Sequence, residues 1–303
     1  MEQMIEITVT AEEAGERIDA YLRRKTELSR SRVSELILGG SLSIDGKEQL
    51  KPSVKISEGQ HICLIVPATQ EVSIKPQNIP IDILYQDADI VVVNKACGMV
   101  VHPAAGHYSG TLVNALMFHC KDDLSGINGV LRPGIVHRID MDTTGVLIAC
   151  KNDLAHNSIA EQLKEHSITR RYQAIVHGVL KQDEGTVDAP IGRHPQDRKK
   201  MCINQQNGKH AVTHYKVLKR FDKFTHIECR LETGRTHQIR VHMASLGHPL
   251  LGDAVYGPAK SPHKLQGQTL HAGILGFVHP RTGEYIEYSA PLPEYFERLL
   301  NIL

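Results

Sequence analysis

The stretch GIVHRIDMDTTGVLIAC, residues 134–150, holds the densest run of polar side chains in the chain and leads directly into an apolar segment. Its apolar end, residues 146–149, predicts a buried β-strand. The hydroxyl, carboxylate and glycine residues before it predict a turn whose backbone polar groups are satisfied locally. By itself, such a turn is more often structural than functional. A protein-kinase catalytic loop is excluded, because kinases place Asp directly after His-Arg and need an upstream glycine-rich nucleotide loop that this chain lacks.

Short β-branched runs recur on both sides of this stretch. They lie at residues 90–93, 172–176, 226–231 and 285–288, and helical patterns lie at 112–118, 154–166 and 237–246. Strands that do not alternate regularly with helices favour an α+β arrangement. We therefore expect residues 81–303 to form an α+β domain with a mixed, largely antiparallel sheet.

A second polar cluster, RLETGRTHQIRVHMASLGHPLLG, occupies residues 230–252. Its Thr-Gly pair predicts a turn, and Thr236 is the expected N-cap of a helix that ends near Gly247. Arg235 lies in this turn, where a short rigid connection could aim its guanidinium into a cleft. His237 and His242 are five residues apart rather than four, so they do not share a helix face as zinc ligands of that type do. No metal site is therefore predicted.

Residues 1–66 are expected to form a smaller module. Amphipathic patterns at residues 18–22 and 33–37 predict two helices, and apolar alternation around the Asp45-Gly46 pair predicts short strands joined by a turn. The helix junction, residues 23–32, carries five basic residues and one acidic residue, a local charge of +4. Such a face could meet a phosphate backbone, although a solvated helical face explains a charge run about equally well. The three prolines of residues 67–80 predict a semi-stiff linker.

The composition of the whole chain is that of an ordinary globular protein. A length of 303 residues predicts about two domains. The 35 Lys and Arg residues balance 34 Asp and Glu residues, for a net charge of +1, which disfavours a protein that is basic throughout. No apolar run reaches the ~18 residues of a membrane-spanning helix, and the first residues lack signal-peptide features, so a soluble cytoplasmic protein is expected. Six cysteines without close pairs predict reduced thiols.

A second basic segment spans residues 193–220. Its basic residues are Arg193, Arg198, Lys199, Lys200, Lys209, Lys216, Lys219 and Arg220, against Asp197 alone, for a local charge of +7. A solvated loop would explain part of this charge. Contact with a polyanion explains it better when it is taken together with the motifs below.

Several of these stretches, taken in order, resemble the RluA-type pseudouridine synthases. They are NKACGMVVHPAAGHYSGTLVNAL, GIVHRIDMDTTGVLIACKND, RRYQAIVHG, PIGRHPQDRKKM, LETGRTHQIRVHMASLGHPLLGD and LHAGILGFVHPRTGEYIEYSAPLP. The resemblance covers roughly residues 80–295. The helix–helix–hairpin order of residues 14–66 resembles the S4 RNA-binding domain, and the combination is closest to synthases of large-subunit ribosomal RNA. The chain departs from the family pattern at Ala96, where proline is frequent, and at Gly267, where arginine is frequent.

The resemblance implies an RNA-modifying isomerase that needs neither metal nor cofactor. It assigns the reacting carboxylate to Asp140, a ring that stacks on the uracil to Tyr172, and the cationic partner of the carboxylate to Arg235. It leaves open whether Asp140 acts as nucleophile or as base. The expected RNA contacts are Arg23, Arg24, Arg30, Arg32, Arg138, Arg193, Arg198, Lys199 and Lys200.

The implied partner is RNA, as 23S ribosomal RNA or the large-subunit particle, with the target base extruded from its stack by a monomeric enzyme. Three alternatives stay open on the sequence. The same chemistry could act on another ribosomal site or on transfer RNA. The chain could instead be a non-catalytic RNA-binding protein of ribosome assembly, which an intact set of Asp140, Tyr172 and Arg235 disfavours. A metal-dependent hydrolase built on the 18 histidines lacks any ligand-spaced trio.

Overall fold

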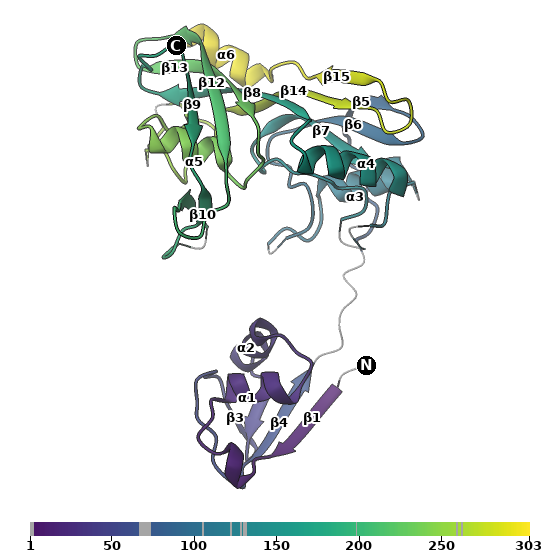
Figure 1. The fold of residues 1–303 in the computed structure, drawn as a ribbon, viewed down its shortest axis with the longest axis vertical. Helices are drawn as coiled ribbons and strands as arrows, with labels where there is room; N and C mark the ends of the chain where they lie inside the picture. Colours follow the sequence, from purple (N-terminus) through teal and green to yellow (C-terminus); the bar gives the residue numbers. More distant parts are fainter. Residues whose placement is uncertain are drawn as a thin grey trace. The chain divides into compact units, whose positions relative to one another are not determined.

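The structure, a computed structural model, describes residues 3–66, 74–104, 106–121, 123–127, 129, 132–197, 199–258, 260–261 and 263–303. The chain divides into two units, Met1–Glu71 and Val72–Leu303 (Figure 1). Half of the expected linker, residues 67–73, lies outside the described residues. Its remainder belongs to the second unit, because Ile74 is buried in that unit's core and the amide of Gln77 donates to the carbonyl of Asn114.

The first unit packs two helices against a small antiparallel sheet. Its elements are β1 (Gln3–Thr8), a 3-10 turn (Ala11–Glu13), α1 (Ile18–Lys25), α2 (Arg30–Leu38), β2 (Leu42–Ile44), β3 (Lys47–Glu48) and β4 (His61–Val66). The strand order is β1-β4-β2-β3. The hydroxyl of Ser29 accepts from the amide of Arg32 and caps α2. Tyr21, Leu22 and Ile37 from the helices are fully buried with Leu64 of the sheet, so one apolar core joins the two layers.

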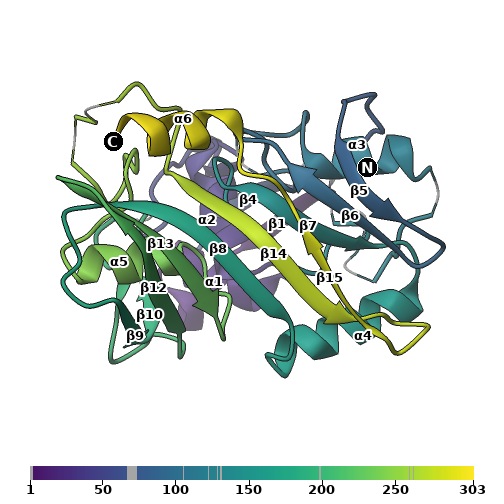
Figure 2. The same ribbon diagram turned by 90° about the horizontal axis from the view of Figure 1, so that it is seen from above.

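The second unit is built on a single large sheet. Along the sheet lie β5 (Asp82–Gln86), β6 (Ile90–Lys95), β7 (Thr144–Cys150), β14 (Leu270–Val278), β8 (Thr169–His177), β13 (Phe224–Leu231), β12 (Val212–Arg220) and β9 (Glu184–Asp188), while β15 (Tyr285–Ser289) pairs with β14. Figure 2 shows the long strands β8 and β14 crossing the middle of this sheet. The β14–β7 pair is parallel and the other described pairs are antiparallel. The predicted mixed, largely antiparallel sheet is thus confirmed.

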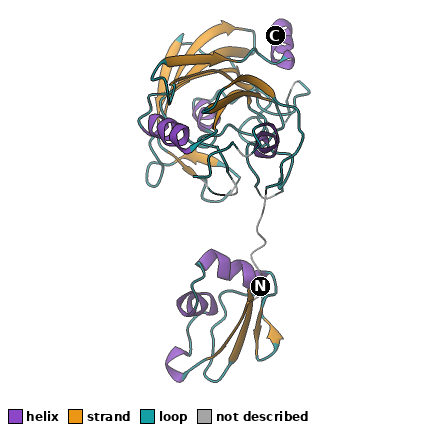
Figure 3. Cartoon of the chain, turned by 90° about the vertical axis from the view of Figure 1, so that its right-hand side faces the viewer, coloured by secondary structure: helices purple, strands orange, loops and turns teal. Residues whose placement is uncertain are grey.

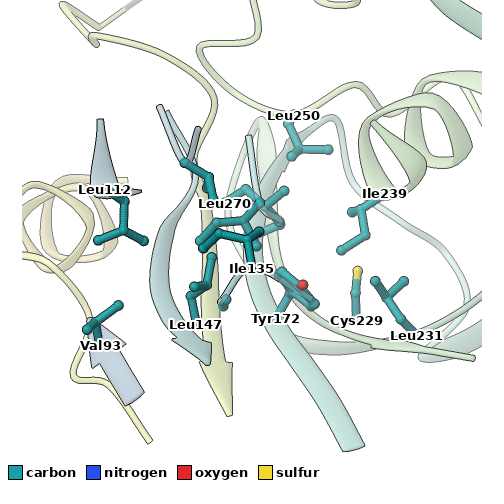
Figure 4. Packing of buried hydrophobic residues seen from close by; sticks show 14 of the residues in the cluster. Val93, Leu112, Ile135, Leu147, Tyr172, Cys229, Leu231, Ile239, Leu250 and Leu270 are labelled. Atoms are coloured by element: carbon teal, nitrogen blue, oxygen red, sulfur yellow. The ribbon is translucent and has the colours of Figure 1, made fainter. Parts of the chain in front are cut away.

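Helices cover both faces of this sheet, as the secondary-structure view in Figure 3 also shows. They are α3 (Leu112–His119), α4 (Asp153–Lys164), α5 (Gln238–Ser245) and α6 (Glu294–Ile302), and a separate hairpin joins β10 (Ile191–Arg193) to β11 (Met201–Ile203). Alternate residues of β7 enter two different cores, because successive strand side chains point to opposite faces. Leu147 packs with α3 and α5 residues in one core, part of which Figure 4 shows, and Ile148 packs with α4 residues in the other.

The described part of the chain contains no helix that is long and apolar enough to cross a membrane. All six cysteines are free thiols. Burial raises the pKa of the Cys150 thiol to about 12, so this group is unreactive at neutral pH.

Candidate active site

A cavity of about 500 Å³ opens beside the polar stretch that precedes β7. Its wall comes from six segments of the second unit: the loop before β7, the end of α4, the strand β8, the end of β13, the turn that leads into α5 together with the first residues of α5, and the start of β14. Its lining includes Arg138, Asp140, Lys164, His166, Arg170, Tyr172, Gly234, Arg235, His237 and Arg240. The predicted site residues Asp140, Tyr172, Arg235 and Arg138 are thereby brought together, although they are distant in the sequence.

Asp140 lies at a tight turn in the middle of the polar stretch. The amide of Thr143 donates to the carbonyl of Asp140 at 3.1 Å, which is the locally satisfied turn that the sequence predicts. The Asp140 carboxylate is 17% exposed, and its Oδ2 accepts a hydrogen bond from Nη1 of Arg240 at 2.9 Å. Among the described residues that line the cavity, Asp140 is the only carboxylate.

A second carboxylate holds Arg240 from behind. Nε and Nη2 of Arg240 donate to the two oxygens of Asp253 at 2.7 and 2.9 Å, and the Asp253 side chain is fully buried. Burial alone would raise the pKa of Asp253, but the hydrogen bonds from Arg240 and from two backbone amides outweigh it and leave the pKa below its usual value. The guanidinium is therefore fixed by Asp253 and presents its remaining edge to Asp140.

The predicted ion pair between Arg235 and Asp140 is wrong. Nε of Arg235 donates instead to the carbonyl of His210 at 2.9 Å, and Arg240 makes the ion pair. Both arginines belong to the motif GRTHQIR, but Arg235 lies in the turn whereas Arg240 lies in the first turn of α5, where side chains tilt back toward the helix N-terminus. Arg235 still lines the cavity.

The start of α5 differs from the prediction as well. The residue before the helix is His237, in a left-handed conformation with φ 58°, and not the expected Thr236. This backbone conformation is uncommon for a residue other than glycine and is often found at functional sites. It turns the imidazole toward the cavity: Nδ1 lies 2.8 Å from the hydroxyl of Tyr256, and Nε2 lies 3.8 Å from Oδ2 of Asp140.

Tyr172 enters the cavity wall from β8. Its side chain is 8% exposed, and burial raises the pKa of its phenol, so the hydroxyl is protonated at neutral pH. The ring packs in the same core as Cys229 and Leu270 (Figure 4). Its position agrees with a platform for a planar ring.

The half-buried His137 and the buried Lys95 shape the loop that carries Asp140. Nε2 of His137 accepts from the amide of Ile148 at 3.1 Å, and burial lowers the pKa of His137 to about 3, so the ring is neutral. Nζ of Lys95, which is 1% exposed, donates to the carbonyls of Ala96, Met99 and Met141 at 2.8 Å each. Lys95 therefore ties β6 to the residue that follows Asp140.

The other predicted RNA contacts are not among the residues that line the cavity. In the first unit, Arg23, Arg24, Arg30 and Arg32 are exposed around the α1–α2 junction. Two of them form weak surface ion pairs, Arg24 with Glu16 and Arg32 with Glu35, and the exposed Arg30 pairs with the buried Asp19. In the second unit, Arg193, Lys199 and Lys200 lie on the β10–β11 hairpin, and Arg198 lies outside the described residues.

One group among the described residues has a metal-like arrangement, namely Asp87, Asp89 and His279. Arg281 already donates to both oxygens of Asp89 at 2.6 Å and lowers the pKa of that carboxyl to about 2. A structural ion-pair network explains this cluster, which contributes no residue to the cavity wall.

Sequence reasoning did not identify Arg240, Asp253, His237, Lys95 or Arg170 as site residues. The signal for the first three lay in the second polar cluster, which extends to the Gly-Asp pair at residues 252–253. Lys95 directly precedes Ala96, where the family frequently has proline, and Arg170 is the first residue of the motif RRYQAIVHG.

The family model described as RNA pseudouridylate synthase matches residues 89–245. The "Uncharacterized RNA pseudouridine synthase YlyB" of Bacillus subtilis is 52% identical over 99% of this chain and 98% of its own length. The "Ribosomal large subunit pseudouridine synthase D" of Zymomonas mobilis is 47% identical over 98% of this chain and 97% of its own. Among solved structures, "Human RNA Pseudouridylate Synthase Domain Containing 1" matches with a TM-score of 0.57 and 25% identity, over 77% of this chain and 96% of that one.

Proposed function

Because the chain belongs to the RNA pseudouridine synthase family and carries its RluA-type motifs, we propose that it modifies uridines of large-subunit ribosomal RNA, with Asp140 as the reacting carboxylate. As a member of this family the protein is an isomerase. It breaks the C1′–N1 bond of uridine, turns the uracil and rejoins it to C1′ through C5. No atoms are gained or lost overall.

The position of Asp140 is the observation that carries this proposal. The reaction needs a carboxylate beside the ribose, either to bond to C1′ or to remove a neighbouring proton. Asp140 is the carboxylate of the described cavity wall, and Arg240 holds its Oδ2 at 2.9 Å. The rival on residue type, Asp142, is not part of that wall, and the side chain of Asp142 packs against Gly267. Geometry therefore favours Asp140.

The cavity suits a single extruded nucleotide. A base inside a stacked RNA cannot reach a carboxylate in the wall of a cavity, so the uridine has to leave the stack at a cost of a few kcal/mol. Arg138, Lys164 and Arg235 place positive charge around the opening, where phosphates could offset that cost. Tyr172 supplies the aromatic face on which the uracil stacks.

The substrate class rests on the relatives and on the first unit. A 47% identical relative is named for the ribosomal large subunit. The exposed arginines of the α1–α2 junction give the first unit a basic face, which supports its proposed role as an S4-like RNA-docking module.

The test compares Asp140→Asn with Asp142→Asn. Both variants receive large-subunit RNA that carries tritium at C5 of uridine, and tritium release reports the isomerisation. We expect no release from Asp140→Asn with RNA affinity unchanged, and measurable release from Asp142→Asn. Full activity of Asp140→Asn would refute the assignment of the carboxylate.

A second experiment tests the substrate. Pseudouridine is mapped in total RNA from cells that lack the protein and from cells complemented with it. We expect sites to disappear from large-subunit RNA and to return on complementation. Loss of sites in transfer RNA alone would refute the proposed substrate while leaving the chemistry intact.

A further inference from the structure

A second guanidinium in the cavity wall differs sharply from that of Arg240. Arg170, in β8, is 6% exposed, and its Nη2 donates to the carbonyl of Glu232 at 2.8 Å. Its Nε is buried and has no hydrogen-bond partner among the residues that the structure describes. Within the described part of the chain, no carboxylate oxygen lies within 4.0 Å of the Arg170 guanidinium. Arg170 is therefore a buried charge without an acidic partner.

Such a charge is unfavourable unless a ligand compensates it. Arginine cannot lose its proton in a protein, so burial does not remove the charge. Buried charges are normally paired or hydrogen-bonded, as Arg240 is at each of its three nitrogens by Asp253 and Asp140. The same cavity thus contains the Arg240 guanidinium, which two carboxylates neutralise, and the Arg170 guanidinium, which is available to pair with negative charge on a ligand.

Gly234 makes the space for this guanidinium. A Cβ atom at Gly234 would lie 2.6 Å from Nη1 of Arg170, and Gly234 lines the same cavity. Because this distance is shorter than a van der Waals contact, any larger residue at position 234 would displace the guanidinium of Arg170. The glycine in the Thr-Gly turn is thus explained by its neighbour in space.

The location of Arg170 relative to Tyr172 indicates the ligand. The two residues are two apart in β8, so their side chains leave the strand on the same face. The positive charge of Arg170 acts on the Tyr172 phenol and opposes the effect of burial on its pKa. A ring stacked on Tyr172 would therefore have the guanidinium close to its polar atoms.

We propose that Arg170 hydrogen-bonds a carbonyl oxygen of the flipped uracil and stabilises the negative charge that the ring gains when its bond to the ribose breaks. This inference rests on the proposed function. When the C1′–N1 bond breaks, its electron pair leaves with the uracil and spreads over N1 and the two carbonyl oxygens. Asp140 acts at the ribose, and Arg170 forms or breaks no covalent bond. Preorganised donors aimed at developing charge are effective catalysts in a cavity that excludes water.

The test combines the substitution of Arg170 with the replacement of each uracil carbonyl oxygen by sulfur, and asks whether the two changes have independent effects on the rate. Wild type and Arg170→Gln react in single turnover with RNA that carries uridine, 2-thiouridine or 4-thiouridine at the target position, and mass spectrometry follows the product. We expect Arg170→Gln to slow uridine about 10²–10³-fold with RNA affinity within threefold of wild type. Sulfur at the contacted position should slow wild type strongly and Arg170→Gln little.

Arg171→Gln is the matched control. Arg171 is the next residue of the same strand, points to the other face, and pairs with Glu287 at the surface. This variant should behave as wild type on all three RNAs. Equal sulfur effects in wild type and Arg170→Gln would overturn the proposal, and a loss confined to RNA affinity would assign Arg170 to a phosphate instead.

Gly234→Ala tests the position of the guanidinium without replacing Arg170, so it gives a result even if Arg170→Gln fails to fold. The added methyl group should displace the guanidinium and slow the reaction in the wild-type background, yet have little further effect in Arg170→Gln. Full activity of Gly234→Ala would contradict the need for a positioned guanidinium. The Asp140→Asn experiment is independent, because a failed Arg170 cycle leaves the role of the carboxylate standing.

Discussion

Replacing Arg240 by methionine removes the charge that two carboxylates share. Methionine keeps most of the side-chain volume, so the main loss is electrostatic. Asp253 is then a fully buried carboxylate without a cation. Removing one member of a buried ion pair typically costs 3–5 kcal/mol. Two backbone amides, from Val255 and Tyr256, still donate to Asp253 at 2.9 and 3.1 Å, so we expect the lower end, about 3 kcal/mol.

The companion variant is the double replacement Arg240→Met with Asp253→Asn. Removing both members of a buried pair is often nearly neutral. We expect most of the 3 kcal/mol to return, because asparagine keeps an acceptor for the two backbone amides. The free energy of unfolding, from urea denaturation followed by circular dichroism, measures this difference, and a domain of this size should melt roughly 6–12 °C lower in the single variant.

The double variant should regain stability but not catalytic activity. Without Arg240, Asp140 loses its hydrogen bond at 2.9 Å, and a misplaced reacting group costs about 10²-fold in rate. The double variant should therefore fold like wild type and still release tritium at least ~10²-fold more slowly. An unchanged unfolding free energy in the single variant, or recovered activity in the double variant, would refute the idea that Arg240 joins a structural carboxylate to a reacting one.

Three further outcomes follow from the same structure. Lys95→Met leaves three partly buried carbonyls without their donor, so we expect a loss of roughly 1–3 kcal/mol in unfolding free energy. Because Met141 follows Asp140 directly, we also expect a lower turnover number at similar RNA affinity, and normal turnover would contradict this. The pKa of His137 is lowered from 6.5 to about 3, so the unfolded chain binds more protons than the folded chain between these pH values. Stability that is present above pH 6.5 should therefore be lost as the pH falls toward 3, by up to about 5 kcal/mol. Urea titrations at several pH values should show that the unfolding free energy of His137→Gln depends less on pH than that of wild type, and an equal pH dependence would count against this role of His137. Lys199→Gln should weaken RNA binding and reduce the slope of log affinity against log salt by about 0.7–0.9, and an identical slope would exclude a phosphate contact there.

Local patterns in the sequence predict the helices and strands of this fold well. They do not predict contacts between segments that are distant in the sequence. The apolar run at residues 146–149 lies inside β7, and the helical pattern at 154–166 corresponds closely to α4. The choice between Arg235 and Arg240 was beyond such patterns. It depends on the left-handed turn at His237, which sets where α5 begins and hence which arginine meets Asp140, on a segment about 100 residues away. Asp253 and Lys95 were missed for the same reason, since their roles appear only when distant segments meet.

The near-zero net charge of the chain is compatible with an RNA substrate because charge acts locally. The described cavity wall carries five side chains that are cationic at neutral pH, Arg138, Lys164, Arg170, Arg235 and Arg240, against the single carboxylate of Asp140. Asp253 neutralises one of the five from behind. A surplus of positive charge therefore faces the cavity, where the screening length of ~8 Å at physiological salt leaves distant acids little influence. In the proposed mechanism the two buried guanidiniums have different roles: Arg240 holds Asp140, the proposed reacting carboxylate, and Arg170 contacts the base.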